Sequence, residues 1–307
     1  MKIMTLQGTD KLLYELVAPL VMNPAILRQN NNYPFKTSRS HVWYIAFHET
    51  AVVDPTAKLH KNVIIEPYAV IGPNCEIGEG SIIGSHAVIS KNVRMGKNNH
   101  VYPNAVIGED PQDLKFAGEY STVVIGNDNS FREFVTIHRA TGENCETRIG
   151  SHNMLQAYTH VAHNCNFGDY IVMSSFSGAA GHVIVEDHAV IGGMSGIHQF
   201  VKIGACAMVG GMSKIVQDVC PFVIVDGNPA RVVGLNSVGL ARNNITPEVR
   251  SWLKKAYRTI FRSGLKLYEA IHEMEQDFPP TPEIEHLLRF LRNCERGLCR
   301  TKDKSQK

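Results

Sequence analysis

The stretch IEPYAVIGPNCEIGEGSIIG, residues 65–84, places an isoleucine at every sixth position from Ile65 to Ile83. Working outward, every sixth residue from Val53 to Ile107 is apolar, and the same phase resumes over residues 125–137 and 149–215. An α-helix repeats every 3.6 residues or so and a half-buried strand alternates every two, so neither accounts for a long period of six. The period instead predicts a parallel β-helix, an all-β solenoid of short strands and turns.

Three hexapeptides make one triangular coil, so residues about 18 apart should stack at the strand spacing of about 4.8 Å. A glycine often follows the inward aliphatic residue, and we expect it to supply the backbone angles that each corner requires. The phase fails where Asp113, Glu119 and Glu143 replace the aliphatic residue. These breaks predict loops at residues 109–121 and 139–147, and such insertions often carry the function of a solenoid.

Three regions follow from these patterns: an N-terminal extension (residues 1–46), the β-helix (47–234) and a C-terminal α-helical domain (235–307). The extension lacks the six-residue phase, has few acidic residues, and contains scattered Lys, Arg, Ser and Asn. It is either an extension without a fold of its own or an organellar targeting segment, with residues 9–20 as a weakly amphipathic part. The second interpretation predicts a mitochondrial protein, and the first a cytoplasmic one.

Helix signals mark the C-terminal region. Thr246 and Thr281 are each followed by a proline and then by apolar residues at helical spacing, which predicts the N-caps of two helices. Gly264 and Gly297 are their predicted stops. We expect these helices to cap the open end of the solenoid and to cover its last strands.

Composition excludes several classes of function. The 307 residues include 31 basic and 29 acidic side chains, a net charge of +2, so no overall field points to nucleic acid. The seven cysteines lack a C-x-x-C pair, which is typical of reduced thiols in an intracellular protein. Apolar runs such as residues 12–22 contain a charge or a proline and fall short of the roughly 20 residues of a membrane span. We therefore expect no transmembrane segment.

The sequence THVAHNC (159–165) places two histidines around the inward residue Val161, so His160 and His163 should point outward or towards a corner of the coil. One coil later, Gly181 should stack against His163. An imidazole beside an exposed glycine N–H is the arrangement of a general base next to an oxyanion donor. This pair predicts a catalytic site.

Further polar residues extend the same line: His182 follows Gly181, and His198 and Gln199 lie on the next coil. Outward histidines of a trimeric β-helix can also share zinc between subunits, as in γ-class carbonic anhydrases, which makes candidate ligands of His160, His163, His182 and His198. Cys165 is a poorer ligand because its phase places it inside the coil. The residues alone leave three functions open: acyl transfer, a zinc enzyme, and a catalytically silent scaffold within an assembly.

Several motifs resemble the UDP-N-acetylglucosamine O-acyltransferases that begin lipid A biosynthesis. They are IGEDPQDLKFAGEYSTVVIG (107–126), TIHRAT (136–141), HVAHNC (160–165) and GLNSVGLARNNI (234–245), and the resemblance spans about residues 47–298. It implies a homotrimer of left-handed β-helices with active sites between subunits. It also implies transfer of an (R)-3-hydroxyacyl chain from acyl carrier protein to the 3-hydroxyl of UDP-N-acetylglucosamine, with neither a metal nor a cofactor.

The resemblance assigns roles to residues of this sequence. His163 is the implied general base and Gly181 the implied oxyanion donor. The implied substrate-binding residues are Gln112, Asp113, Lys115, His138, His160, His182, His198, Gln199, Asn236 and Arg242. Among these, Asp113 and Lys115 would bind the glucosamine and its acyl group across the subunit interface. Gln199 would lie near the nucleotide, and Asn236 and Arg242 would meet the diphosphate.

The resemblance also implies that the residue at position 211, here Gly211 with Met208 close by, limits the length of the acyl chain. A glycine leaves room there and predicts a chain of about 12 to 14 carbons.

Three residues depart from the family pattern. Asn164 stands where the family has an acidic residue after the base, Pro229 replaces a histidine, and Asn243 replaces the second of two arginines.

Overall fold

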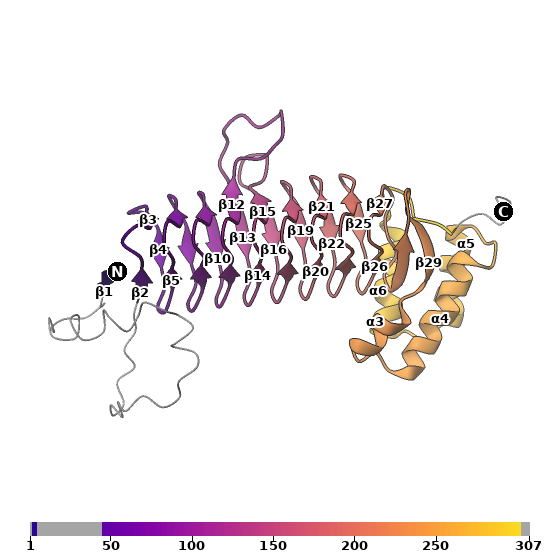
Figure 1. The fold of residues 1–307 in the computed structure, drawn as a ribbon. Helices are drawn as coiled ribbons and strands as arrows, with labels where there is room; N and C mark the ends of the chain where they lie inside the picture. Colours follow the sequence, from indigo (N-terminus) through magenta and orange to yellow (C-terminus); the bar gives the residue numbers. More distant parts are fainter. Residues whose placement is uncertain (1, 5–44, 302–307) are drawn as a thin grey trace, which may run out of the picture.

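The computed structural model describes residues 2–4 and 45–301. It forms a left-handed parallel β-helix whose short strands stack into three sheets, with helices gathered at the C-terminal end of the stack (Figure 1). This confirms the predicted fold class. The interior is filled by the aliphatic or aromatic residue of each hexapeptide and by a second, mostly small or β-branched residue four positions later, and residues such as Ile71, Cys75 and Phe131 are buried.

The three sheets run the length of the coil. Sheet 1 contains β1 (Lys2–Met4), β2 (Ile45–Phe47), β5 (Ile64–Ile65), β8 (Ile82–Ile83), β11 (His100–Val101), β14 (Ser130–Phe131), β17 (Met154–Leu155), β20 (Val172–Met173), β23 (Val190–Ile191), β26 (Met208–Val209), β28 (Val223–Asp226) and β29 (Arg231–Leu235). Sheet 2 contains β4 (Lys58–Leu59), β7 (Glu76–Ile77), β10 (Val93–Met95), β13 (Ser121–Ile125), β16 (Cys145–Ile149), β19 (Asn166–Phe167), β22 (Ile184–Val185) and β25 (Lys202–Ile203). Sheet 3 contains β3 (Val52–Val53), β6 (Val70–Ile71), β9 (Val88–Ile89), β12 (Val106–Glu109), β15 (Thr136–His138), β18 (His160–Val161), β21 (Gly178–Ala179), β24 (Gly196–Ile197) and β27 (Lys214–Ile215).

Strand register confirms the predicted stacking where the coil is regular. Ile64 pairs with Ile82, and His160 pairs with Gly178, each 18 residues later. Around the insertions the register lengthens, so that Val106 pairs with Thr136. The longer insertion, between β12 and β13, projects from the side of the solenoid as the large loop in Figure 1.

The repeat glycines do not mainly supply the backbone angles of the corners, as we had expected. Gly72 does not have a positive φ; a Cβ there would lie 1.5 Å from the Ser90 carbonyl oxygen of the next coil. The left-handed corner angles belong to other residues, such as Asn74 (φ 56°) and Tyr158 (φ 62°). The glycines are therefore needed because adjacent coils approach closely, and most of them do not supply corner geometry.

Up to residue 301, four helices follow the coil: α3 (Ser237–Arg242), α4 (Pro247–Phe261), α5 (Leu267–Asp277) and α6 (Pro282–Arg292). Thr246 and Thr281 cap α4 and α6 through their side chains, as predicted. The predicted glycine stops are wrong, because α4 ends at Phe261 and α6 at Arg292. The C-cap residues are Arg262 and Asn293, whose backbone N–H groups bond back into the helix. None of the described helices is long and apolar enough to cross a bilayer.

Two predicted boundaries lie close to strands. The first strand that continues the stack, β2, begins at Ile45, and the proposed division between residues 234 and 235 falls at the end of β29. Lys2–Met4 pair antiparallel with β2. The predicted targeting segment, residues 9–20, lies outside the described residues.

Candidate active site

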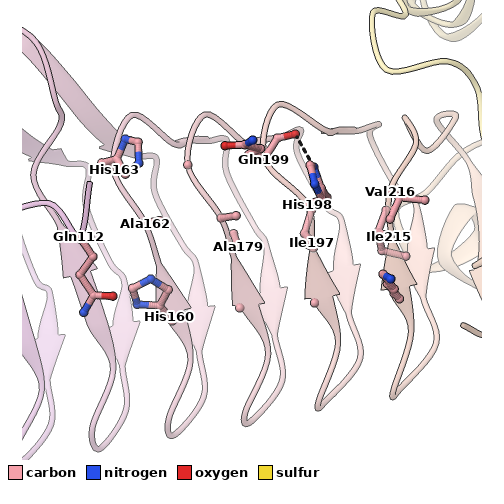
Figure 2. Close-up of a pocket in the computed structure, with 15 residues that line it drawn as sticks. Gln112, His160, Ala162, His163, Ala179, Ile197, His198, Gln199, Ile215 and Val216 are labelled. Carbon is pink, nitrogen blue, oxygen red and sulfur yellow. Dashed lines mark hydrogen bonds between the residues drawn. The ribbon is translucent and has the colours of Figure 1, made fainter. Parts of the chain in front are cut away.

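A groove of about 570 Å³ runs along sheet 3 and crosses four successive coils (Figure 2). Its lining includes six residues predicted from the sequence: Gln112, His160, His163, Gly181, His198 and Gln199. Its walls also include Gly178 and Gly196, small residues that leave the strands open to a ligand. The coil repeat thus aligns side chains that are far apart in the sequence.

His163 has a defined tautomer. Its Nδ1 lies 2.8 Å from Asn164 Oδ1. The Asn164 amide cannot be reversed, because its Nδ2 donates to the Thr141 carbonyl at 3.0 Å and its Oδ1 accepts from the Thr141 N–H at 3.0 Å. Since Oδ1 can only accept, His163 Nδ1 carries the hydrogen. Nε2 of His163 is therefore the basic nitrogen that faces the groove.

Gly181 lies directly against this imidazole. A Cβ on Gly181 would approach His163 Nε2 and Cε1 at 2.6 Å, so any side chain would displace the ring. Within the described part of the chain, the Gly181 N–H has no hydrogen-bond partner, whereas its carbonyl accepts from Phe200. The predicted juxtaposition of His163 and Gly181 is confirmed. It places a free backbone donor beside a basic nitrogen.

The large loop brings a carboxylate to the same place. Asp113 Oδ2 lies 3.9 Å from His163 Nε2. The pKa of Asp113 is lowered by a hydrogen bond from the Lys115 backbone, and also by the Thr141 side chain and the His163 imidazole. We expected Asp113 to act across a subunit interface. Within one chain it already lies beside the base, because the loop folds back over its own coil.

The neighbouring histidines are held neutral. Burial, together with the nearby His138 and His163, lowers the pKa of His160 to about 4. His160 Nδ1 is 2.8 Å from Thr136 Oγ1. Burial, followed by proximity to His163, also lowers the pKa of His182. These rings therefore offer hydrogen bonds rather than positive charge at neutral pH.

His138 and His198 make contacts with parts of the chain outside the repeat. His138 Nδ1 lies 2.6 Å from the Asp110 carbonyl at the base of the large loop, so this nitrogen donates. His198 Nδ1 lies 3.3 Å from Arg296 Nη2, which comes from the segment after α6. Arg296 and the groove residue Lys214 were not predicted, since no sequence motif marks either of them.

Other predicted residues do not line this groove within one chain. The Asn236 side chain is buried and caps α3, where Oδ1 accepts from Gly239 N and Nδ2 donates to the Cys206 carbonyl. Arg242 is in the last turn of α3. The remaining predicted residues outside the groove lining are Asp113, Lys115, His138, His182, Met208 and Gly211. Among the described residues, no group of three or more His, Cys, Asp or Glu side chains is placed to hold a metal ion.

Comparison with known proteins places the chain in one family. A family described as Udp N-acetylglucosamine O-acyltransferase, Domain 2, matches residues 218–299, and the bacterial transferase hexapeptide family matches residues 56–91. An acyl-(acyl-carrier-protein)–UDP-N-acetylglucosamine O-acyltransferase of Thermodesulfovibrio yellowstonii is 46% identical over 255 residues, which cover 82% of this chain and 98% of the relative. The chain belongs to the UDP-N-acetylglucosamine O-acyltransferase family.

Solved structures of UDP-N-acetylglucosamine acyltransferases extend the comparison. The O-acyltransferase of Moraxella catarrhalis is 42% identical, with a TM-score of 0.79 over 83% of this chain and 99% of its own. The Arabidopsis acyltransferase is 33% identical, with a TM-score of 0.68 over 82% of this chain and 99% of its own. Membership of this family does not favour the zinc enzyme or the silent scaffold.

Proposed function

We propose that this protein transfers an (R)-3-hydroxyacyl chain from acyl carrier protein to the 3-hydroxyl of UDP-N-acetylglucosamine. The observation that carries the proposal is the His163–Gly181 pair, in which a basic Nε2 lies beside a backbone N–H that has no partner among the described residues. Acyl transfer needs both groups, a base for the hydroxyl proton and a donor for the oxyanion. Family membership supplies the identity of the two substrates.

The reaction follows from the positions of these atoms. The sugar 3-hydroxyl attacks the thioester carbonyl while His163 Nε2 takes its proton. The carbonyl oxygen becomes an oxyanion, which accepts a hydrogen bond from Gly181 N–H. Collapse of the intermediate breaks the carbon–sulfur bond, and the leaving thiolate takes the proton from His163 Nε2. Asn164 stabilises the proper ring orientation throughout, because its Oδ1 accepts from Nδ1.

Asp113 adds electrostatic support to the base. Its carboxylate lies near His163 Nε2, where positive charge appears when the ring takes the proton. A sugar hydroxyl or amide N–H placed between the two groups can also donate to the carboxylate. Gln112, the preceding residue, lines the same groove. The loop that carries them is thus proposed to bind the glucosamine.

A homotrimer is part of the proposal. Phe134, Tyr158 and Phe176 are exposed and stack at centroid distances of 4.7 and 4.9 Å along the corner between sheets 1 and 3. The exposed Met194 and Met212 continue this column. Such an apolar stripe favours contact with another subunit. A subunit packed there would flank the groove on sheet 3 and bring a further surface to the substrate.

The acyl chain is proposed to lie along that corner. Met208 begins β26 of sheet 1, and Gly211 lies in the turn between β26 and β27, next to the apolar column; neither lines the single-chain groove. A neighbouring subunit would join the two surfaces. With glycine at position 211, the space accommodates a long chain, for which we propose about 12 to 14 carbons.

The decisive experiment is a transfer assay with purified protein, UDP-N-acetylglucosamine and a series of 3-hydroxyacyl carrier proteins. Appearance of the carrier thiol together with a 3-O-acylated sugar nucleotide, identified by mass, is the expected result. Light scattering on the same sample should give the mass of a trimer. An intact trimer that transfers no hydroxyacyl chain from any carrier thioester would overturn the proposed activity.

A further inference from the structure

A buried arginine lies at the base of the large loop. Arg139 follows β15 and is 1% exposed. Burying a guanidinium is costly unless its donors find partners, so those partners indicate what the residue is for. They belong almost entirely to the loop and to the strands on either side of it.

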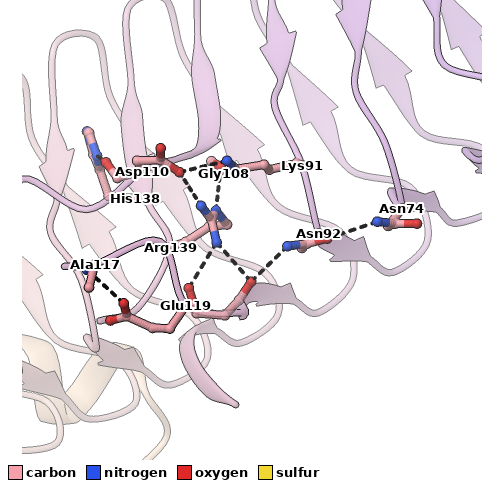
Figure 3. A network of polar contacts seen from close by, with 10 residues as sticks. Asn74, Lys91, Asn92, Gly108, Asp110, Ala117, Glu119, His138 and Arg139 are labelled. Carbon is pink, nitrogen blue, oxygen red and sulfur yellow. Dashed lines mark hydrogen bonds and ion pairs between the residues drawn. The ribbon is translucent and has the colours of Figure 1, made fainter. Parts of the chain in front are cut away.

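The Arg139 side chain reaches both ends of the loop (Figure 3). At the first end, Nε donates to the Gly108 carbonyl at 3.2 Å, and Nη2 pairs with the Asp110 carboxylate. At the second end, Nη1 donates to the Ser121 carbonyl at 3.2 Å and to its hydroxyl at 3.0 Å. The Arg139 backbone N–H also donates to the Glu109 carbonyl at 3.0 Å. One side chain therefore joins the residues where the loop leaves β12 and enters β13.

The remainder of the loop has few anchors. The ring of Phe116 lies 5.6 Å from the Arg139 guanidinium carbon, so the clasp also touches the middle of the loop. Glu119 accepts from Ala117 and Gly142 backbone N–H groups. Leu114, by contrast, is fully exposed. The loop has no regular secondary structure, so its position depends on these contacts, on the hydrogen bond between His138 and the Asp110 carbonyl, and on hydrogen bonds between Tyr120 and the second insertion.

The part of the loop held in this way points at the reaction centre. Gln112 lines the groove, and Asp113 Oδ2 lies 3.9 Å from His163 Nε2. Arg139 itself does not line the groove. A contact of this kind fixes a distant group by closing the base of its loop, without touching the substrate.

We propose that Arg139 is a positioning residue, which clasps the two ends of the 109–120 loop and so holds Gln112 and Asp113 over the groove for the sugar nucleotide. The inference rests on the proposed function for the identity of the ligand, but the clasp is a property of the chain alone. It predicts that loss of the Arg139 contacts loosens the loop and weakens sugar-nucleotide binding through Asp113. The coil and the base should stay in place.

The first test is Arg139→Lys. Lysine keeps the charge and can pair with Asp110, but it lacks the planar fork needed to reach Gly108 and Ser121 together. Hydrogen exchange of amides in residues 109–120 should rise about tenfold, with no comparable rise in β18 or β21. KM for UDP-N-acetylglucosamine should rise about tenfold and kcat should fall less, because ground-state binding is lost. Unchanged loop exchange and unchanged KM would overturn the proposal.

The matched control is Arg132→Lys. Arg132 lies seven residues earlier, is part-exposed and bonds to its neighbour Glu133 rather than to the loop. Loop exchange and KM should stay at wild-type values in this variant. Equal effects in both variants would mean that any loss of an arginine on these coils disturbs the protein, which contradicts a specific clasp.

Coupling to Asp113 separates positioning from general stability. If Arg139 acts through Asp113, the effect of Arg139→Lys on kcat/KM should largely disappear in an Asp113→Ala background. If the double variant instead loses kcat/KM by the product of the two single-variant factors, the two residues act independently and the proposal is overturned. The exchange measurement requires no substrate. If the wild-type protein transfers no acyl chain, the proposed function is refuted, and the exchange result still decides whether Arg139 holds the loop.

A milder variant covers the case in which Arg139→Lys does not fold. Asp110→Asn removes only the carboxylate partner, which lies on the surface. It should raise loop exchange and KM by a smaller factor of about three. Lys91→Ala, which removes the other ion-pair partner of Asp110 at 3.0 Å, is its control and should change neither quantity. If Asp110→Asn behaves like Lys91→Ala, the clasp does not hold the loop.

Discussion

At the scale of single residues, the site depends on how one amide is held. Asn164 stands where the family pattern has an acid, yet its Oδ1 accepts from His163 Nδ1 as a carboxylate would. Two hydrogen bonds to the Thr141 backbone fix the amide in this orientation. A neutral acceptor orients the ring without adding charge. The adjacent carboxylate is supplied instead by Asp113, from the large loop.

Replacing His163 by alanine should abolish most of the activity and keep the fold. Loss of a positioned general base lowers kcat by about 10²–10⁴-fold. His86→Ala, a substitution at a coil corner far from the groove, is the control and should retain full activity. Steady-state rates and circular dichroism on both variants test this. An active His163→Ala trimer would refute the assignment of the base.

The depressed pKa of His160 makes stability depend on pH. The unfolded chain binds a proton near pH 6.5 and the folded chain near pH 4, so between these values the unfolded state carries more protons. The stabilising contribution is complete above about pH 6.5 and is lost as pH falls towards 4. We expect an upper limit of about 3 kcal/mol for this loss.

The measurement compares wild type with His160→Asn by denaturant unfolding at pH 7.5 and 4.5, at one protein concentration. The difference in free energy of unfolding between the two proteins should shrink by about 2 kcal/mol at the lower pH, because the variant has no imidazole to protonate. An unchanged difference would show that the His160 pKa is the same in the folded and unfolded states.

Gly211 is the site at which we expect chain length to be set. A Cβ there would meet its nearest atom, the Gly193 carbonyl oxygen, at 3.4 Å, so a side chain fits without rearrangement. Gly211→Met should shorten the preferred hydroxyacyl chain by several carbons, since each excluded methylene forfeits about 0.8 kcal/mol. Competition between long and short donors measures the shift. Gly234→Met, which enters open space on β29, is the control and should keep the wild-type preference.

At the scale of elements, α4 presents a basic surface beyond the end of the coil. Its members are exposed Lys and Arg side chains, namely Lys254, Lys255, Arg258 and Arg262. Lys255 Nζ also lies 4.7 Å from the centre of the Phe278 ring, so part of its charge is engaged inside the domain. Lys254 and Arg258, one helical turn apart, are the better candidates for contact with an acidic carrier protein.

Reversing these two charges should weaken carrier binding. Lys254→Glu with Arg258→Glu should raise KM for the acyl carrier protein severalfold at low ionic strength, and the effect should fade as salt screens it. Lys58→Glu with Lys97→Glu, on the coil, is the matched double reversal and should leave this KM unchanged. An unchanged KM in the α4 variant at low salt would remove α4 as the docking surface.

At the scale of the whole molecule, the catalytic parts lie within the coil and its loop, and the helices pack at one end (Figure 1). Deleting residues 1–44 should therefore leave kcat and the trimeric state unchanged, because β2 and the strands after it remain. Rate measurements and light scattering test this. The proposed mitochondrial location requires that a tagged protein redistributes in cells on the same deletion, and no change of location would refute it.

The sequence determined the solenoid because its period of six is local: each hexapeptide buries its aliphatic residue and a small residue four positions later, and this pattern repeats along the coil. The same repeat predicts that His163 lies against Gly181, because the two are one coil of 18 residues apart and no insertion interrupts the coil between them. The helix starts at Thr246 and Thr281 were predictable for a similar reason, because an N-cap depends on the next three residues.

Only the tertiary structure decided what crosses between coils or arrives from loops. Asp113 comes to His163 because the 109–120 loop folds back, and counting residues fails once an insertion changes the register. Arg296 meets His198 across 98 residues of chain, through the packing of the C-terminal segment on the coil. The repeat glycines proved necessary for close approach of the next coil, which is a contact between distant residues and leaves no local signal.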